Sequence, residues 1–148
     1  MTSNEPTHQH HIVTGIDGSK SSIEALEWAA RQAHLTGATL DVITTWDWPP
    51  NLGWSVPIPE DYDPAADAKL VLESALEPIR QAYPDLNVEA QAAEGHPAPV
   101  LVAASRDADL LVIGSRGRGA FAGMLLGSVS EHCVNHAHCA VTVVRDHP

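Results

Sequence analysis

The sequence predicts an α/β fold with one domain, an open five-stranded parallel sheet that carries helices on both faces. Short β-branched or apolar runs alternate along the chain with longer segments of helical periodicity, which is typical of parallel strands joined by helices. The run at residues 109–114 is apolar almost throughout, which indicates a strand covered on both faces. The chain has 148 residues, enough for one such domain and its core.

The first third of the chain predicts a strand, a helix and a second strand. Isoleucine and valine predict the first strand at residues 12–16. Ser21 and Glu24 have the spacing of a capping box, so we expect a helix to begin there. Gly37 suits the left-handed residue that ends such a helix. The β-branched run at 39–46 predicts the second strand.

The middle of the chain contains a long irregular connection followed by a helix. Residues 47–63 are rich in proline and tryptophan, and connections of this length are usually functional or disordered. Asp63 and Pro64 predict the N-cap and first position of a helix that runs to about Tyr83. Pro78 lies inside this helix and is expected to kink it or to end it early. The later elements are expected as a strand at 86–93, a helix at 98–105, a strand at 109–114, a helix at 128–136 and a strand at 140–145.

The composition excludes several classes of partner and location. Eight basic residues against 19 acidic residues give a net charge of −11, whereas nucleic-acid binding requires a basic surface. The apolar runs are far shorter than the ~20 residues that span a membrane. Residues 1–11 are polar, carry no signal-peptide pattern and are expected to form a flexible tail before a domain at 12–148. We therefore expect a cytoplasmic protein with neither a nucleic-acid nor a membrane partner.

The two cysteines, Cys133 and Cys139, are too few for a disulfide framework, and their redox state stays open. Cys133 is interpreted as a small buried filler of the core.

No metal site is predicted from the histidines. His8, His10 and His11 lie in the tail without a further ligand at a suitable spacing. His132 and His136 have a spacing that can chelate an ion on one helix, but the His-Glu-x-x-His pattern is absent.

A glycine-rich segment directly follows the most apolar strand. Glycine lets a backbone turn tightly and approach a ligand closely. Between residues 110 and 130 there is no acidic side chain, while Arg116 and Arg118 supply two of the eight basic ones. The segment is therefore a candidate anion site. Its glycines are Gly114, Gly117, Gly119, Gly123 and Gly127.

The helix expected after this segment begins with Gly127, Ser128, Val129 and Ser130. Unpaired N–H groups and the positive end of the helix dipole make such a start favourable for phosphate. The two serine hydroxyls add donors for phosphate oxygens or ligands for a bound cation.

The spacing Gly114-x2-Gly117-x9-Gly127-Ser128 resembles that of the universal stress protein family, whose ATP-binding members carry G-x2-G-x9-G-[S/T]. The resemblance extends from about Ile12 to Arg145. It implies a sheet with strand order 3-2-1-4-5, a fold of the adenine nucleotide alpha hydrolase-like type, and ATP as ligand, with or without Mg²⁺. It also implies a homodimer through the last strand, Ala140 to Arg145, whose apolar edge is open to pairing.

The resemblance also assigns site residues. Thr45, or its neighbour Trp46, would approach the base. The implied nucleotide-binding residues are Gly15, Ile16, Asp17, Thr45, Gly114, Arg116, Gly117, Gly127, Ser128, Val129 and Ser130.

Several alternatives stay open at this point. Asp17 in Asp17-Gly18-Ser19 has the pattern of a side chain that bonds only its own turn. No general base stands out, so we expect no catalytic residue and at most a slow ATPase. The leading hypothesis is an ATP-dependent regulator in the stress response. Its rivals are a dimeric interaction module with a vestigial nucleotide pocket, and a slow ATPase or a binder of another adenine nucleotide.

Overall fold

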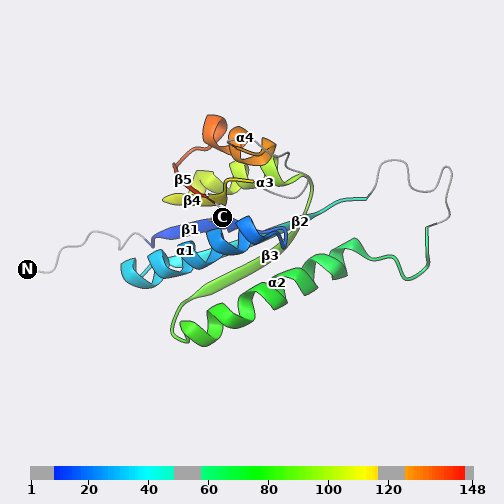
Figure 1. Cartoon of the computed structure of the whole chain (residues 1–148), viewed down its shortest axis with the longest axis horizontal. Coiled ribbons are helices and arrows are strands. Elements are labelled where there is room, and N and C mark those ends of the chain that lie inside the picture. The colour runs from blue at the N-terminus through cyan, green and yellow to red at the C-terminus, as the bar shows by residue number, and fades with distance from the viewer. Residues whose placement is uncertain (1–8, 49–57, 117–125, 146–148) are drawn as a thin grey trace, which may run out of the picture.

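A computed structural model describes residues 9–48, 58–116 and 126–145 of the chain. Its five strands form one parallel sheet in the order β3-β2-β1-β4-β5, which confirms the predicted fold class (Figure 1). The elements are β1 (His11–Gly15), α1 (Lys20–Thr36), β2 (Thr39–Trp46), α2 (Pro64–Ala82), β3 (Val88–Glu94), α3 (Pro97–Ala104), the 3₁₀ helix η1 (Ser105–Asp107), β4 (Leu110–Gly114), α4 (Ser128–His136) and β5 (Ala140–Val144).

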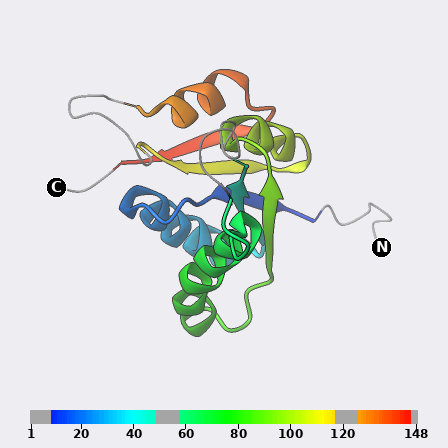
Figure 2. The same ribbon diagram turned by 90° about the vertical axis from the view of Figure 1, so that its right-hand side faces the viewer.

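Helices α1 and α2 cover one face of the sheet, and α3 and α4 lie on the other (Figures 1 and 2). Small residues of α1, among them Ala25, Ala29 and Ala33, are completely buried and let this helix lie close to the strands. The larger apolar side chains of this core include Leu26, Leu40, Val42, Leu72, Leu76 and Val112.

A second, smaller core lies beneath α3 and α4. It contains Val13, Ile43, Leu101, Leu111, Ile113 and Cys133. Strand β1 takes part in both cores, because alternate residues of a strand point to opposite faces.

The direction of winding reverses at β1, which pairs with β2 on one side and with β4 on the other. The chain leaves β1 towards β2 and β3 and later returns to place β4 and β5 on the opposite side. In open α/β sheets, such a reversal leaves a crevice at the carboxyl ends of the flanking strands. The fold therefore places the segments after Gly15 and Gly114 at a position suited to a ligand.

The caps of α1 differ partly from the prediction. Ser19, not Ser21, is the N-cap, and its hydroxyl oxygen accepts a hydrogen bond from the Ser22 N–H at 3.3 Å. The predicted start was wrong because the turn after β1 is compact, so the helix already begins at Lys20 and Ser21 is buried. The other end is confirmed, since Gly37 caps the helix with a left-handed φ of 72°.

Helix α2 begins as predicted and ends at Ala82, one residue before the predicted end at about Tyr83. Asp63 is the N-cap and accepts from the Ala66 N–H at 3.1 Å. The helix passes through Pro78 to Ala82 instead of ending early. Pro78 and Ser74, whose carbonyl loses its helical partner, are both exposed, so water can satisfy that carbonyl.

The remaining boundaries follow the prediction closely, and α4 spans the expected residues 128–136. Strand β1 begins at His11, one residue inside the expected tail. Within the described ranges, no helix is long and apolar enough to cross a membrane. Most of the connection at 47–63, including Trp54, lies outside the described residues.

The two cysteines are free thiols in different surroundings. Cys133 is fully buried in the second core, as expected of a filler residue, whereas Cys139 is partly exposed. Burial raises the pKa of the Cys133 thiol to about 11. Burial, with a contribution from Asp109, also raises the pKa of Cys139.

We expect iodoacetamide at pH 8 to modify Cys139 first and Cys133 only when the chain unfolds, because the thiolate is the reactive form. Between pH 9 and about 11, the unfolded chain releases the Cys133 proton that the folded chain retains. The free energy of unfolding should therefore fall as the pH rises through that interval, and should fall less in Cys133→Ala. Mass spectrometry of the alkylated chain and urea titrations at each pH measure both effects. Rapid modification of Cys133 in the folded chain would contradict the assignment.

Candidate functional site

A cavity lies where β1, β2 and β4 end and where α3 and α4 begin. Most of its wall is apolar, and a few polar side chains stand among the apolar ones. This is the position that the reversal of winding at β1 favours.

Most of the site residues expected from the sequence line this cavity. The structure brings together Gly15, Ile16, Asp17, Thr45, Gly114, Arg116, Val129 and Ser130. Gly127 and Ser128 lie beside them at the start of α4 but do not line the cavity. Gly117 lies outside the described residues.

Sequence reasoning missed the other five lining residues. Ile43 could have been predicted, because residues two apart in a strand share a face and Thr45 was already expected in the site. Pro97 and Leu101 come from α3, and no sequence signal places this helix over the crevice. The missed residues are Ser22, Ile43, Pro97, Leu101 and Ile113.

Of the two neighbours at the end of β2, Thr45 and Trp46, only one lies in the cavity wall. Thr45 lines the cavity, and Trp46, the next residue along the strand, does not. The Trp46 ring instead meets Trp48 edge-on, with ring centroids 6.3 Å apart. Trp48 in turn lies 5.8 Å from the Tyr62 ring, so three aromatic residues form a row beyond the strand.

Asp17 both lines the cavity and shapes the turn that follows β1. Its Oδ1 accepts from the Ser19 N–H at 2.8 Å, as the turn-forming alternative predicts. Gly18 has a φ of 82°, a conformation that glycine adopts without a steric penalty. The two interpretations of Asp17 are therefore compatible, because one carboxylate oxygen serves the turn while the residue still forms part of the wall.

Gly114 allows α1 to approach the end of β4. A Cβ atom at this position would lie 2.3 Å from Ser21 Oγ and 2.8 Å from the backbone C and O atoms of Ser21. The same Ser21 hydroxyl accepts from the Arg116 N–H at 3.3 Å. The first turn of α1 therefore fixes the backbone direction of the chain as it leaves β4.

Hydrogen bonds from the segment after Gly114 hold α4 and β5 in place. The Ser115 N–H donates to the Val144 carbonyl at 2.9 Å, and the Ser115 carbonyl accepts from the Gly127 N–H at 2.7 Å. The Ser130 hydroxyl donates to the Gly114 carbonyl. Gly127 and Ser130 therefore have structural roles, and Ser130 can donate to a ligand only if its hydroxyl turns away.

The beginning of α4 still offers donors towards the cavity. Its N-cap is Gly127, so no side chain caps the first turn, where Val129 and Ser130 line the cavity. Arg116 stands in the same wall. Unpaired amides at a helix start together with a guanidinium group favour an anion. The apolar wall provided by residues such as Ile16 and Leu101 suits a flat, weakly polar group.

Comparison with known proteins gives one consistent family. A sequence model of the Universal stress protein family matches residues 9–145. A universal stress protein of Mycobacterium tuberculosis is 34% identical over 142 residues, which are 95% of this chain and 50% of that protein. A universal stress protein of Mycobacterium bovis is 33% identical over 150 residues, covering 95% of this chain and 49% of that protein. The chain thus spans about half the length of the curated relatives it matches.

Solved structures agree with the fold. A universal stress protein in complex with cAMP is 27% identical, with a TM-score of 0.67, covering 93% of this chain and 98% of that one. The universal stress protein UspA from Lactobacillus plantarum is 20% identical, with a TM-score of 0.73 over 95% of this chain and 100% of that one.

We expect Gly114→Ala to lower the free energy of unfolding by about 1–3 kcal/mol, because the new methyl group forces α1 away from β4. Urea unfolding followed by circular dichroism measures this change. Ser21→Ala removes the hydroxyl but leaves the backbone atoms 2.8 Å from the new Cβ. The double variant should therefore remain destabilised relative to Ser21→Ala alone. If the double variant were as stable as Ser21→Ala, the hydroxyl of Ser21 alone, and not its backbone, would exclude a Cβ atom at residue 114.

Proposed function

The chain belongs to the universal stress protein family, and we propose that it binds an adenine nucleotide, ATP in particular, in the cavity at the ends of β1 and β4. The observation that supports this most is the composition of the cavity wall, which joins an apolar region to Arg116 and the start of α4. The complex of a 27% identical universal stress protein with cAMP gives independent support for an adenine nucleotide as the ligand class.

In the proposed complex, the base occupies the apolar part of the cavity. Ile16, Ile43 and Leu101 supply the surface for the ring, and Thr45 supplies a polar group at its edge. Asp17 lies at the ribose end, where a carboxylate oxygen can accept from a sugar hydroxyl.

The phosphates point to the other end of the cavity. Arg116 and the first-turn amides of α4, near Val129, face this part of the ligand. Charge-assisted hydrogen bonds of this kind contribute about 1.5–3 kcal/mol each. Gly117 and Ser128 complete the proposed phosphate contacts, and Mg²⁺ accompanies the phosphates if the ion is bound.

We propose that the bound nucleotide regulates this protein in a stress response, because the chain belongs to the universal stress protein family. The same proposal has two variants. In one, the ligand is a cyclic or other adenine nucleotide, and in the other, the protein hydrolyses ATP slowly. The second candidate function is an interaction module with a vestigial pocket. It is supported by Gly127 and Ser130, because both already form hydrogen bonds within the protein through groups that would otherwise be free for a ligand.

We expect ATP to bind the wild-type chain with a dissociation constant of ~1 µM, a binding free energy of about −8 kcal/mol. Arg116→Gln should weaken ATP about tenfold or more but leave adenosine unchanged, because adenosine carries no phosphate. Thr45→Trp should weaken both ligands, because its ring fills the base end. Isothermal titration calorimetry measures all of these affinities.

Arg80→Gln is the matched control for this test, since Arg80 is an exposed arginine of α2 paired with Glu73 at 3.2 Å and does not line the cavity. Both ligands should bind it as they bind the wild type. The proposal fails if ATP does not bind at millimolar concentration. It also fails if Arg116→Gln has no larger effect than Arg80→Gln.

We also propose that two copies of the chain pair through β5, which lies at the edge of the sheet next to β4. Its valines are only partly buried in one chain, and an open apolar edge favours pairing with another strand. Light scattering after size exclusion should give a dimer for the wild type and a monomer for Thr142→Lys, which places a charge at mid-strand in both copies. Ser74→Lys, on the exposed surface of α2, is the control and should remain a dimer. A monomeric wild type would contradict this assignment.

A further inference from the structure

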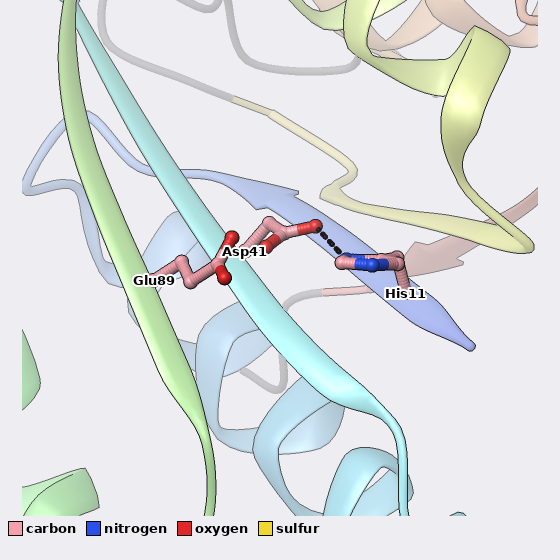
Figure 3. Close-up of side chains that lie close together, drawn as sticks. All are labelled: His11, Asp41 and Glu89. Carbon is pink, nitrogen blue, oxygen red and sulfur yellow. Dashed lines mark hydrogen bonds and ion pairs between the residues drawn. The ribbon is translucent and has the colours of Figure 1, made fainter. Parts of the chain in front are cut away.

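Three metal-ligating side chains from three neighbouring strands converge on the sheet face that carries α3 and α4. His11 comes from β1, Asp41 from β2 and Glu89 from β3, and one ligand atom of each lies within 4.8 Å of the others (Figure 3). We propose that His11, Asp41 and Glu89 bind a divalent first-row metal ion, with Zn²⁺ as the ion that this donor set favours. This proposal is independent of the nucleotide site.

The sheet register itself brings the two carboxylates together. Asp41 and Glu89 are direct partners across the β2–β3 pair, so their side chains emerge side by side on the same face. Like charges placed directly opposite one another destabilise a strand pair. A cation between them removes this repulsion and adds ligand bonds.

The histidine joins the pair from the other side of Asp41. His11 Nδ1 lies 2.8 Å from Asp41 Oδ2, and both side chains are largely covered, with exposed fractions of 29% and 20% (Figure 3). This bond serves one carboxylate oxygen only. Asp41 Oδ1 is buried and has no hydrogen-bond partner among the described residues. A buried carboxylate oxygen without a donor is energetically costly, and a metal ion would satisfy it.

The neighbours of Asp41 offset its negative charge only in part. Burial raises the pKa of Asp41, the hydrogen bond and charge of His11 lower it, and Glu89 raises it again. The largest contribution is the loss of water around the group, which a bound cation offsets directly.

The donor set and its dimensions fit zinc. Zinc binds imidazole nitrogen and carboxylate oxygen at about 2.0–2.2 Å, so neighbouring ligand atoms lie about 3.4 Å apart. Binding requires His11 Nδ1 and Asp41 Oδ2, now 2.8 Å apart, to exchange their hydrogen bond for bonds to the ion. The Glu89 side chain is exposed and can turn towards them. Three protein ligands leave a position for water. Calcium and magnesium favour sites made of oxygen ligands, whereas imidazole favours the later first-row ions.

The site is distinct from the nucleotide cavity. His11 is the first residue of β1, and Gly15, which lines the cavity, is the last. A strand rises about 3.3 Å per residue, so the two sites lie at opposite ends of β1. The proposed ion joins β1, β2 and β3 at a place where neither α3 nor α4 supplies a ligand.

Zinc titration of the full chain after treatment with a chelator tests the proposal, with Co²⁺ absorption as a direct report on the ligand sphere. We expect one tight site per chain, a rise in Tm with Zn²⁺, and a loss of affinity of about tenfold or more in Glu89→Gln, Asp41→Asn and His11→Gln. Glu89→Gln decides the result if Asp41→Asn does not fold, because Glu89 is exposed. Glu94→Gln, an exposed glutamate on the same strand, is the matched control and should bind Zn²⁺ as the wild type does.

Other histidines require a second control, because His8 and His10 precede β1 and the rings of His132 and His136 lie 4.5 Å apart on α4. We expect His10→Gln and His132→Gln to retain the tight site. The proposal is overturned if the chain binds no Zn²⁺, or if Glu89→Gln binds it as well as Glu94→Gln does. It is also overturned if the tight site disappears in His10→Gln or His132→Gln instead.

Discussion

The close contact between the end of β4 and the start of α1 organises the whole end of the sheet that carries the cavity. Gly114 has no side chain, so the backbone of Ser21 lies where a Cβ atom would otherwise be. The next residue, Ser115, donates to Val144 of β5 and accepts from Gly127 before α4. One short segment therefore sets the positions of α1, β5 and α4 relative to the sheet, and the cavity is the space that these positions leave.

The sequence predicts the fold well because its signals are local and consistent. Periodicity, the Asp63–Pro64 cap and the left-handed Gly37 each specify an element without tertiary information. The wrong cap at Ser21 and the failure of Pro78 to end α2 early both arise where tertiary or solvent context decides. Ser21 resembles a cap in the sequence but is buried against β4, and Pro78 lies on an exposed side of α2 where a missing hydrogen bond costs little.

The candidate site is predictable in part for a similar reason. Residues at the ends of β1 and β4 follow from the strand order, because the reversal of winding brings those ends together. Leu101 is not predictable in this way, since its role depends on how α3 lies over the crevice. The pairing of Asp41 with Glu89 was also beyond the sequence, because it depends on the register between two strands separated by a helix. A shift of the register by one residue would place Glu89 on the other face.

The two faces of the sheet are covered unequally, and this inequality affects how freely the sequence can vary. Helices α1 and α2 cover one face, whereas α3 and α4 leave the half formed by β2 and β3 partly open (Figure 2). Polar side chains such as Asp41, Glu89 and Gln91 occupy that half without disturbing either core. Substitutions of the exposed residues there, Glu89 and Gln91, alter the chemistry of the surface while leaving the packing intact. The exposed part of this strip can therefore change its charge and polarity at little cost to the stability of the fold.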